Sequence, residues 1–244
     1  MEPSLLLLIC LIFALAIGVL VKLLLQKYIS RNNQKYQVVD PRPIASEAPY
    51  TFFLPSPAEL AAIQKGDIVK LMFEYSHQTE TWDVERMWVI VEKMDGKLEG
   101  VLDNDPDEPT SPLLAGDPIV FDRHQVIDIL WDNPEQAPEP IARREYWDRC
   151  LVDDCVLDGT EPIEFIYREE ANMDVKGDEY SDSGWRIRGR MGNMTDEEAE
   201  ARAVQYVAIG AVLNKDNSWE KMVDAPIGTR LIRNFSTNAY EAED

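Results

Sequence analysis

The residues best able to do chemistry in this chain are two cysteines, two histidines and a large set of carboxylates. Cys150 and Cys155 have four residues between them, which is neither a redox Cys-x-x-Cys pair nor a zinc-ligand spacing. With only His77 and His124 to add imidazole, the sequence predicts no metal site and no cofactor, although a Cys–His nucleophilic pair stays open. Phosphate-loop, dinucleotide-binding, Gly-x-Ser-x-Gly and His-Glu-x-x-His motifs do not occur in the sequence. We therefore predict no catalytic residues and a protein that is not an enzyme.

The carboxylates are concentrated in two segments, around residues 103–108 and 169–182. The candidate partner-binding residues are Asp103, Asp105, Asp107, Glu108, Glu169, Glu170, Asp174, Asp178, Glu179 and Asp182. The first segment lacks the central glycine and final glutamate of a calcium-binding EF-hand loop. Acidic loops are usually only solvated, and Arg186, Arg188 and Arg190, which alternate after Trp185, indicate that some of these acids pair internally as weak surface ion pairs.

The whole chain is strongly acidic. Its 244 residues include 45 Asp and Glu against 24 Lys and Arg, a formal charge of −21. Residues 1–35 hold four of the bases and one acid, so residues 36–244 keep 20 bases and 44 acids, a net charge of −24. This balance excludes a broad basic face that binds nucleic acid directly. A hydrophobic content of 45% is enough for a packed core and excludes wholesale disorder.

The N-terminal segment is apolar from Leu5 to Leu25, interrupted only by Lys22. As a helix these 21 residues would measure about 30 Å, the thickness of a bilayer core. The alternative, a cleaved signal peptide, requires a basic start, whereas Met1–Ser4 contains an acid and no base. All the nearby basic residues lie on the C-terminal side of the apolar run, which predicts a single-pass protein of the bacterial inner membrane with a cytoplasmic C-terminal part.

The helices and strands expected from the sequence must position the candidate residues, and together they indicate an α+β fold. This fold is an N-terminal transmembrane helix followed by two small antiparallel-sheet domains with few short helices. The expected divisions are a membrane anchor at 1–28, a linker at 29–49, a β-rich domain at 50–131, a linker at 132–140 and a second α+β domain at 141–244.

In the first domain, Ser56 and Glu59 form a capping box that predicts a helix from Pro57 to about Gln64. Runs of β-branched and aromatic residues predict five short strands of a bent sheet or open barrel, at 68–74, 86–93, 97–102, 118–121 and 125–131.

In the second domain, we expect helices at 141–149 and 195–205, the latter capped by Thr195 and Glu198. The expected strands are 155–157, 164–167, 185–188, a central strand at 206–213 and a partner strand at 218–223.

Two stretches resemble known families. Residues 65–131, with 65–70, 85–89, 100–106 and 121–128 as the shared segments, are similar to a small β-rich bacterial domain of unknown function. Residues 155–235 resemble an immunity-type domain found beside bacterial polymorphic and type VI secretion toxins. The segments that carry this second resemblance are 181–185 (Ser-Asp-Ser-Gly-Trp), 210–214 (Gly-Ala-Val-Leu-Asn), 218–219 (Ser-Trp) and 224–228 (Asp-Ala-Pro-Ile-Gly).

The second resemblance implies a protein that neutralises a cognate toxin by binding it. Because the chain is so acidic, a nuclease with a positive cleft is the favoured toxin, covered by an acidic surface. Two other functions stay open, a membrane-tethered scaffold without a toxin partner and an enzyme with an unrecognised pocket. A homodimer is also left open. Trp185 and Trp219 are expected in the core, and Gly184, Gly210 and Gly228 at turns or close contacts.

Overall fold

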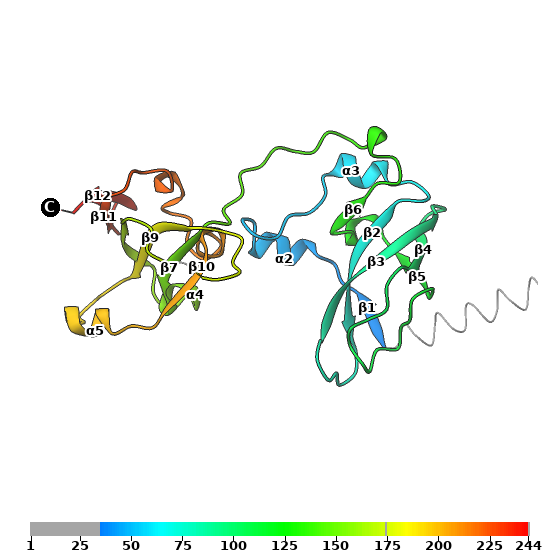
Figure 1. The fold of residues 1–244 in the computed structure, drawn as a ribbon, viewed down its shortest axis with the longest axis horizontal. Coiled ribbons are helices and arrows are strands. Elements are labelled where there is room, and N and C mark those ends of the chain that lie inside the picture. The colour runs from blue at the N-terminus through cyan, green and yellow to red at the C-terminus, as the bar shows by residue number, and fades with distance from the viewer. Residues whose placement is uncertain (1–34, 174, 244) are drawn as a thin grey trace, which may run out of the picture. The chain divides into compact units, whose positions relative to one another are not determined.

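The structure, a computed structural model, describes residues 35–173 and 175–243, which form two compact units (Figure 1). Unit 1 contains residues 54–141 and the segment that ends at Pro43, and unit 2 contains residues 44–53 together with 142 onward. Unit 2 is therefore assembled from two separated pieces of the sequence. The domain boundaries expected from the sequence stay a prediction.

Unit 1 is built on a six-stranded sheet in which every neighbouring pair is antiparallel. Its strands are β1 (Tyr36–Val38), β2 (Ile68–Tyr75), β3 (Val84–Lys93), β4 (Leu98–Leu102), β5 (Pro118–Phe121) and β6 (Asp128–Leu130). Side chains alternate between the two faces of these strands, so that Val69, Leu71 and Phe73 of β2 are fully buried. The five strands expected from the sequence are all present.

The connection from β5 to β6 shows why this sheet is strongly bent. In a flat sheet of order β6-β2-β3-β4-β5 the two strands would lie about 19 Å apart, at four spacings of about 4.8 Å. Only residues 122–127 join them, and Arg123–Gln125 form a compact 3₁₀ turn. The sheet must therefore curl until its edges approach, which gives the nearly barrel-shaped form predicted from the sequence (Figure 1).

The helices between residues 35 and 141 are short. They are α2 (Arg42–Glu47), most of which belongs to unit 2, α3 (Pro57–Ala62) and 3₁₀ turns at Arg123–Gln125 and Pro134–Gln136. At the start of α3 the Ser56 Oγ accepts the Glu59 N–H at 3.2 Å, and the Glu59 carboxylate accepts the Ser56 N–H at 2.7 Å. This confirms the capping box, although the helix ends earlier than expected.

Unit 2 contains a second six-stranded sheet, of order β10-β7-β9-β8-β11-β12. The strands are β7 (Arg149–Asp153), β8 (Ile163–Arg168), β9 (Asp182–Gly189), β10 (Val204–Ala208), β11 (Arg230–Asn234) and β12 (Ala239–Ala242). The pair β7–β9 is parallel and the other pairs are antiparallel. Two strands of this unit, 164–167 and 185–188, were expected nearly as found.

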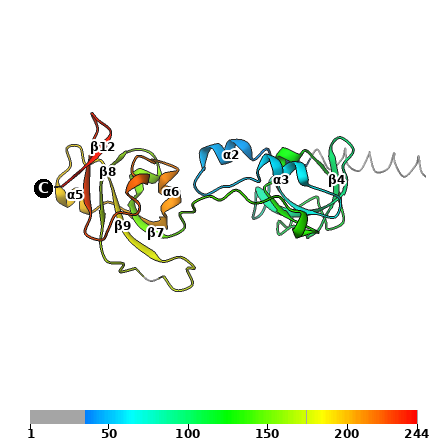
Figure 2. The same ribbon diagram turned by 90° about the horizontal axis from the view of Figure 1, so that it is seen from above.

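One face of this sheet carries the core of unit 2. The helices of this unit are α4 (Asp154–Leu157), α5 (Asp196–Glu200), α6 (Ile209–Leu213) and a 3₁₀ turn at Glu220–Met222. Val156 of α4 and Val212 of α6 pack with Ile166 and Ile187 of the sheet, and Figure 2 shows α6 next to β7. On the opposite face, Arg188 of β9 donates a hydrogen bond to the Ala199 carbonyl of α5.

Residues 44–53 are held to unit 2 by specific hydrogen bonds. Asn214, just after α6, accepts the Tyr50 N–H at 2.8 Å and donates to the Thr51 hydroxyl at 2.7 Å. A Cβ on Gly210 would stand 2.8 Å from the Tyr50 carbonyl oxygen, so this position needs glycine for close approach.

Several of the helices and strands predicted for unit 2 differ from those in the structure. Residues 141–147 form no helix and lead into β7, and the expected strand 155–157 is helix α4. The expected central strand 206–213 divides into edge strand β10 and helix α6, because Ile209, Val212 and Leu213 recur at helical spacing and bury one face. The expected strand at 218–223 contains the turn Glu220–Met222 instead.

The expected fold class also requires correction. The described chain is mostly β, with few short helices, and the second sheet is mixed rather than antiparallel. The helix expected over residues 5–25 lies outside the described residues. Within 35–173 and 175–243, no helix combines the length and apolar character needed to cross a membrane. A single-pass inner-membrane localisation is therefore not supported, and that expectation is corrected.

Candidate functional site

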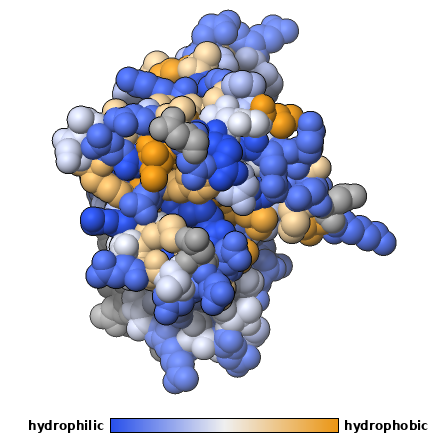
Figure 3. Space-filling model, turned by 90° about the vertical axis from the view of Figure 1, so that its left-hand side faces the viewer, coloured by the Kyte–Doolittle hydropathy of each residue, from blue (hydrophilic) through white to orange (hydrophobic). Residues whose placement is uncertain are grey.

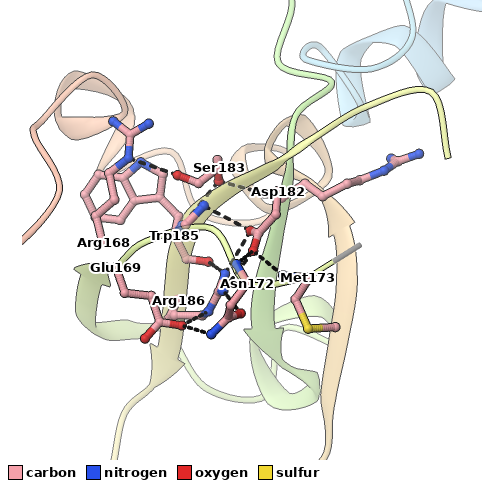
Figure 4. A network of polar contacts seen from close by, with 10 residues as sticks. Arg168, Glu169, Asn172, Met173, Asp182, Ser183, Trp185 and Arg186 are labelled. Atoms are coloured by element: carbon pink, nitrogen blue, oxygen red, sulfur yellow. Dashed lines mark hydrogen bonds and ion pairs between the residues drawn. The ribbon is translucent and has the colours of Figure 1, made fainter. Parts of the chain in front are cut away.

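The acidic segment 169–182 is folded onto the second sheet by the guanidinium group of Arg186 on β9 (Figure 4). Arg186 donates both Nη groups to the Asp182 carboxylate at 2.9 Å and its Nε to Glu169 at 2.7 Å. The remaining two N–H groups reach the Asn172 side-chain oxygen at 2.7 Å and the Trp185 carbonyl at 3.0 Å. All five donors of this arginine are therefore satisfied within unit 2.

Asp182 is the buried end of this network. Its side chain is 1% exposed, and it also accepts backbone N–H groups from Gly184 at 2.9 Å, Asn172 at 3.1 Å and Met173 at 3.2 Å. Burial acts to raise the Asp182 pKa, but the Arg186 guanidinium and these N–H groups outweigh it and lower the pKa to about 2. The group is thus a structural anion, not a free contact.

A second ion pair fixes the middle of the segment. Arg149 of β7 donates Nε and Nη2 to the Asp178 carboxylate at 2.7 and 2.9 Å, and its guanidinium lies 5.4 Å from the ring centre of Tyr180. The Arg149 guanidinium holds the pKa of Asp178 below its usual range. Pairing of the acidic segment with the arginines after Trp185 is therefore observed for Glu169 and Asp182, through Arg186, although the Asp182 pair is buried and not a weak surface pair. Asp178 pairs instead with Arg149, which the sequence did not indicate.

The other acidic segment belongs to unit 1, where Glu108 is 2% exposed. Its carboxylate accepts the backbone N–H groups of Glu80, Thr81 and Trp82 at 2.9, 2.8 and 2.9 Å, and hydrogen bonds from Thr110. Burial opposes ionisation, yet these donors hold the Glu108 pKa well below its usual range. Glu108 therefore holds the loop between β2 and β3 in place, and its carboxylate is not available to a partner.

The ten candidate acids consequently divide into two groups. Glu108, Glu169, Asp178 and Asp182 bind groups of their own unit, and Asp174 lies outside the described residues. The exposed members are Asp103, Asp105, Asp107, Glu170 and Glu179, and of these Asp105 also accepts the Ala115 N–H at 2.9 Å. The sequence identified both segments but did not separate the acids that shape them from those that face solvent.

Arg188 and Arg202 form a further ion cluster that the sequence analysis missed. Both contact the fully buried Asp153 at the end of β7, at 3.0 Å from Arg188 and 3.2 Å from Arg202. Arg188 was expected to pair with the neighbouring acidic segment. The only sequence signal for this cluster is an aspartate that closes an apolar strand, Cys150–Asp153.

In the described part of the chain, the cysteines and histidines form no recognisable reactive centre. Cys150 is fully buried, and burial raises its pKa, while burial also raises the pKa of half-buried Cys155. Both thiols therefore disfavour the nucleophilic thiolate. Across residues 35–173 and 175–243, no group of three or more His, Cys, Asp and Glu side chains is placed to hold a metal ion.

The residues that carried the resemblance in unit 2 meet in its core. Trp185 and Trp219 are both fully buried, with ring centres 5.5 Å apart at 66°, which confirms their expected place. The Trp185 indole donates to the Val223 carbonyl at 3.0 Å, next to the 224–228 loop, and Arg168 donates to the Ala225 carbonyl at 2.7 Å. The separate sequence motifs are therefore parts of one packed structure.

Residues 150–243 match the family model of the immunity protein Imm33 domain. This confirms the resemblance to an immunity-type domain and supports a toxin-immunity role in general. The matched region contains all six strands of the second sheet apart from Arg149, the first residue of β7. No curated protein and no solved structure matches the chain.

Within the region that matches the Imm33 model, the acidic segment packs closely against β9, the strand that carries Arg186. Gly184 shows how closely they fit, because its φ is +79° and a Cβ there would overlap the Glu169 carbonyl oxygen. The Glu169 N–H donates to the Gly184 carbonyl at 3.0 Å. The glycine of the Ser-Gly-Trp motif therefore allows the start of the acidic segment to pack directly against β9.

Proposed function

We propose that this protein is an immunity protein that binds and neutralises a cognate secreted bacterial toxin. The observation that carries the proposal is the match of the Imm33 domain to nearly the whole second sheet. Binding without chemistry is consistent with the raised thiol pKa values described above. Neutralisation would then follow from occlusion of the toxin's working surface.

The proposed contacts are the exposed acids of the two segments. In the Imm33 domain these are Glu170 and Glu179, on a segment whose path is set by the Arg186 and Arg149 ion pairs. In unit 1 they are Asp103, Asp105 and Asp107. The paired acids position the segments, whereas the exposed ones would meet the toxin.

A nuclease that acts in the cytoplasm is the toxin class that fits the charge best. A nuclease attracts phosphates with a positive cleft, and a chain of charge −21 is attracted to the same field. Electrostatic steering raises association rates to about 10⁸–10⁹ M⁻¹s⁻¹ at low salt, compared with about 10⁵–10⁶ M⁻¹s⁻¹ for neutral partners. Rapid capture matters for a toxin that is already close to its substrate.

The proposal is tested by co-expressing the full chain with the polypeptide encoded by the adjacent reading frame. We expect restored growth and a complex in pull-downs whose recovery falls between low and high salt. Absence of both protection and complex at every ionic strength would refute the immunity function. A complex that does not respond to salt would refute only the electrostatic part.

A pair of charge reversals then tests the acidic contacts. Asp103→Lys with Asp107→Lys changes the proposed contact loop, and Glu92→Lys with Asp95→Lys changes exposed acids of the same unit outside it. We expect weaker toxin binding and a smaller salt dependence for the first pair only. Equal losses for both pairs would mean that overall charge, not this loop, matters.

A further inference from the structure

A cleft of about 410 Å³ opens on the face of the second sheet that does not carry the core. We call it the open-face cleft, and its floor is formed by Phe165 and Tyr167 of β8 and Ile232 of β11. The side chains of α5 and of the chain just after it, Ala199, Glu200 and Arg202, border it. None of these residues belongs to the acidic segments discussed above.

Strand register explains why these apolar side chains lie on the face away from the core. Ile166 pairs with Ile187 and Leu231, and Ile166 and Ile187 belong to the core, so the neighbours of Ile166 in sequence point to the other face. Phe165 and Tyr167 therefore lie together on that face, with ring centres 5.4 Å apart and stacked at 26°. Ile232, opposite Phe165, is 43% exposed.

The cations of the cleft are already engaged. Arg188 and Arg202 hold the buried Asp153, and Arg230, which lies 5.0 Å from the Phe165 ring centre, pairs with Glu243 at 2.6 Å. The carboxylates that line the cleft already offset these three guanidinium groups, so an anionic ligand would add a further negative charge. The cleft is therefore poorly suited to a phosphate or an acidic peptide.

Two carboxylates of the cleft lack a cation. Glu164 accepts the Met191 N–H at 2.7 Å, and Glu200 is exposed on α5, and neither has an ion pair among the described residues. With four carboxylates and three guanidinium groups, the lining is net negative. Figure 3, which views the end of the molecule where β11, β12 and α5 are labelled, shows apolar patches bordered by hydrophilic residues.

We infer that the open-face cleft is the socket for a lysine or arginine side chain carried on a loop of the toxin. The aliphatic part of that side chain would lie against Ile232 and the aromatic floor, and its charged end would reach Glu164 and Glu200. A small apolar floor with a polar rim is the arrangement found at interface hot spots. This inference rests on the proposed function and assigns it a contact surface distinct from the acidic segments.

The test measures the affinity of the full-length chain for the toxin identified by co-expression, using titrated pull-downs. Ile232→Lys and Glu200→Lys alter the cleft. The matched controls are Ile227→Lys, an isoleucine of similar exposure outside it (52% against 43%), and Glu197→Lys, on the same helix but not lining it. Neither altered residue belongs to the core cluster of Trp185 and Trp219, and a urea unfolding curve of each variant checks that it is folded.

We expect both cleft variants to bind at least about tenfold more weakly and both controls to stay within about twofold. Glu200→Gln, which removes the charge alone, should give a smaller loss in the same direction. Wild-type affinity in both cleft variants would overturn this inference while leaving toxin binding itself intact. Loss in Ile232→Lys alone would overturn the basic occupant, and failure of the wild-type chain to bind would overturn the proposed function as well.

Discussion

Replacement of Asp182 by asparagine tests whether the Arg186 network holds the acidic segment in place. The substitution keeps the size of the side chain but removes its charge and turns one acceptor into a donor. That donor would face Arg186 and backbone N–H groups that need acceptors. Because the side chains of Asp182 and Arg186 are 1% and 5% exposed, water cannot replace the lost partner.

The pKa of Asp182 gives the size of the effect. A fall from 3.8 to about 2 corresponds to about 2 kcal/mol of preferential stabilisation of the ionised carboxylate in the folded state. Removing one partner of a buried ion pair costs about 3–5 kcal/mol. Glu169 stays bonded to Arg186 and offsets part of this, so we expect a loss of about 2–4 kcal/mol.

Urea unfolding measures the free energy of unfolding of unit 2 when it is followed by tryptophan emission in a chain whose unit 1 tryptophans, Trp82, Trp88 and Trp131, are replaced by phenylalanine. The buried Trp185 and Trp219 then dominate the change in emission. Asp178→Asn is the matched control, because it removes an ion pair from the same segment at a more accessible position, and it should cost less. A change below about 0.5 kcal/mol in Asp182→Asn, within the range of ordinary surface substitutions, would refute the structural role assigned to this network.

The same network predicts a dependence on pH. Since the folded pKa of Asp182 lies below its unfolded value, its stabilisation is complete above the unfolded pKa and is lost as the pH falls through the folded pKa. Between about pH 5 and pH 2 the free energy of unfolding of the wild-type chain should therefore fall by about 2 kcal/mol through protonation of Asp182. The Asp182→Asn variant has no carboxylate at this position and should not show this part of the loss. Identical acid sensitivity of the two proteins would contradict the assignment.

Three further perturbations probe other contacts. Glu108→Gln should lower the melting temperature of unit 1 and speed proteolysis of the loop it holds, because its carboxylate accepts three consecutive backbone N–H groups; unchanged cleavage kinetics would contradict this. Gly184→Ala should cost more than about 2 kcal/mol in urea unfolding, whereas Gly159→Ala, also at positive φ but with open space around it, should cost less. Cys150 should resist alkylation in the folded protein while Cys155 reacts slowly, as read by peptide mass spectrometry.

The sequence predicted the elements whose signals are local. The capping box at Ser56 and the strands of unit 1 follow from residue type and spacing over a few positions. The predictions that failed concern segments whose secondary structure depends on tertiary contacts. Residues 206–213 are apolar throughout, and only packing against β7 and α4 selects a short edge strand followed by a helix.

The candidate site was limited in the same way. Spacing located both acidic segments, but Glu108 and Asp107 look equivalent in sequence although one is buried and the other exposed. Of the alternating arginines after Trp185, Arg186 pairs with the acidic segment as expected. No pattern showed that Arg188 would contact Asp153, 35 residues away, because that depends on the parallel pairing of β7 with β9.

The division of unit 2 into two pieces has a consequence for how the protein is made. Tyr50 and Thr51 leave the ribosome early, yet their hydrogen-bond partner Asn214 is synthesised more than 160 residues later. All of residues 54–141 emerge in between and can fold as unit 1 while the early segment waits. A gene fragment that starts at residue 142 would encode the region that matches the Imm33 model without this segment. Asn214 and Gly210 would then lose their contacts with Tyr50 and Thr51. Domain-deletion experiments therefore need residues 44–53 supplied, in cis or as a separate peptide.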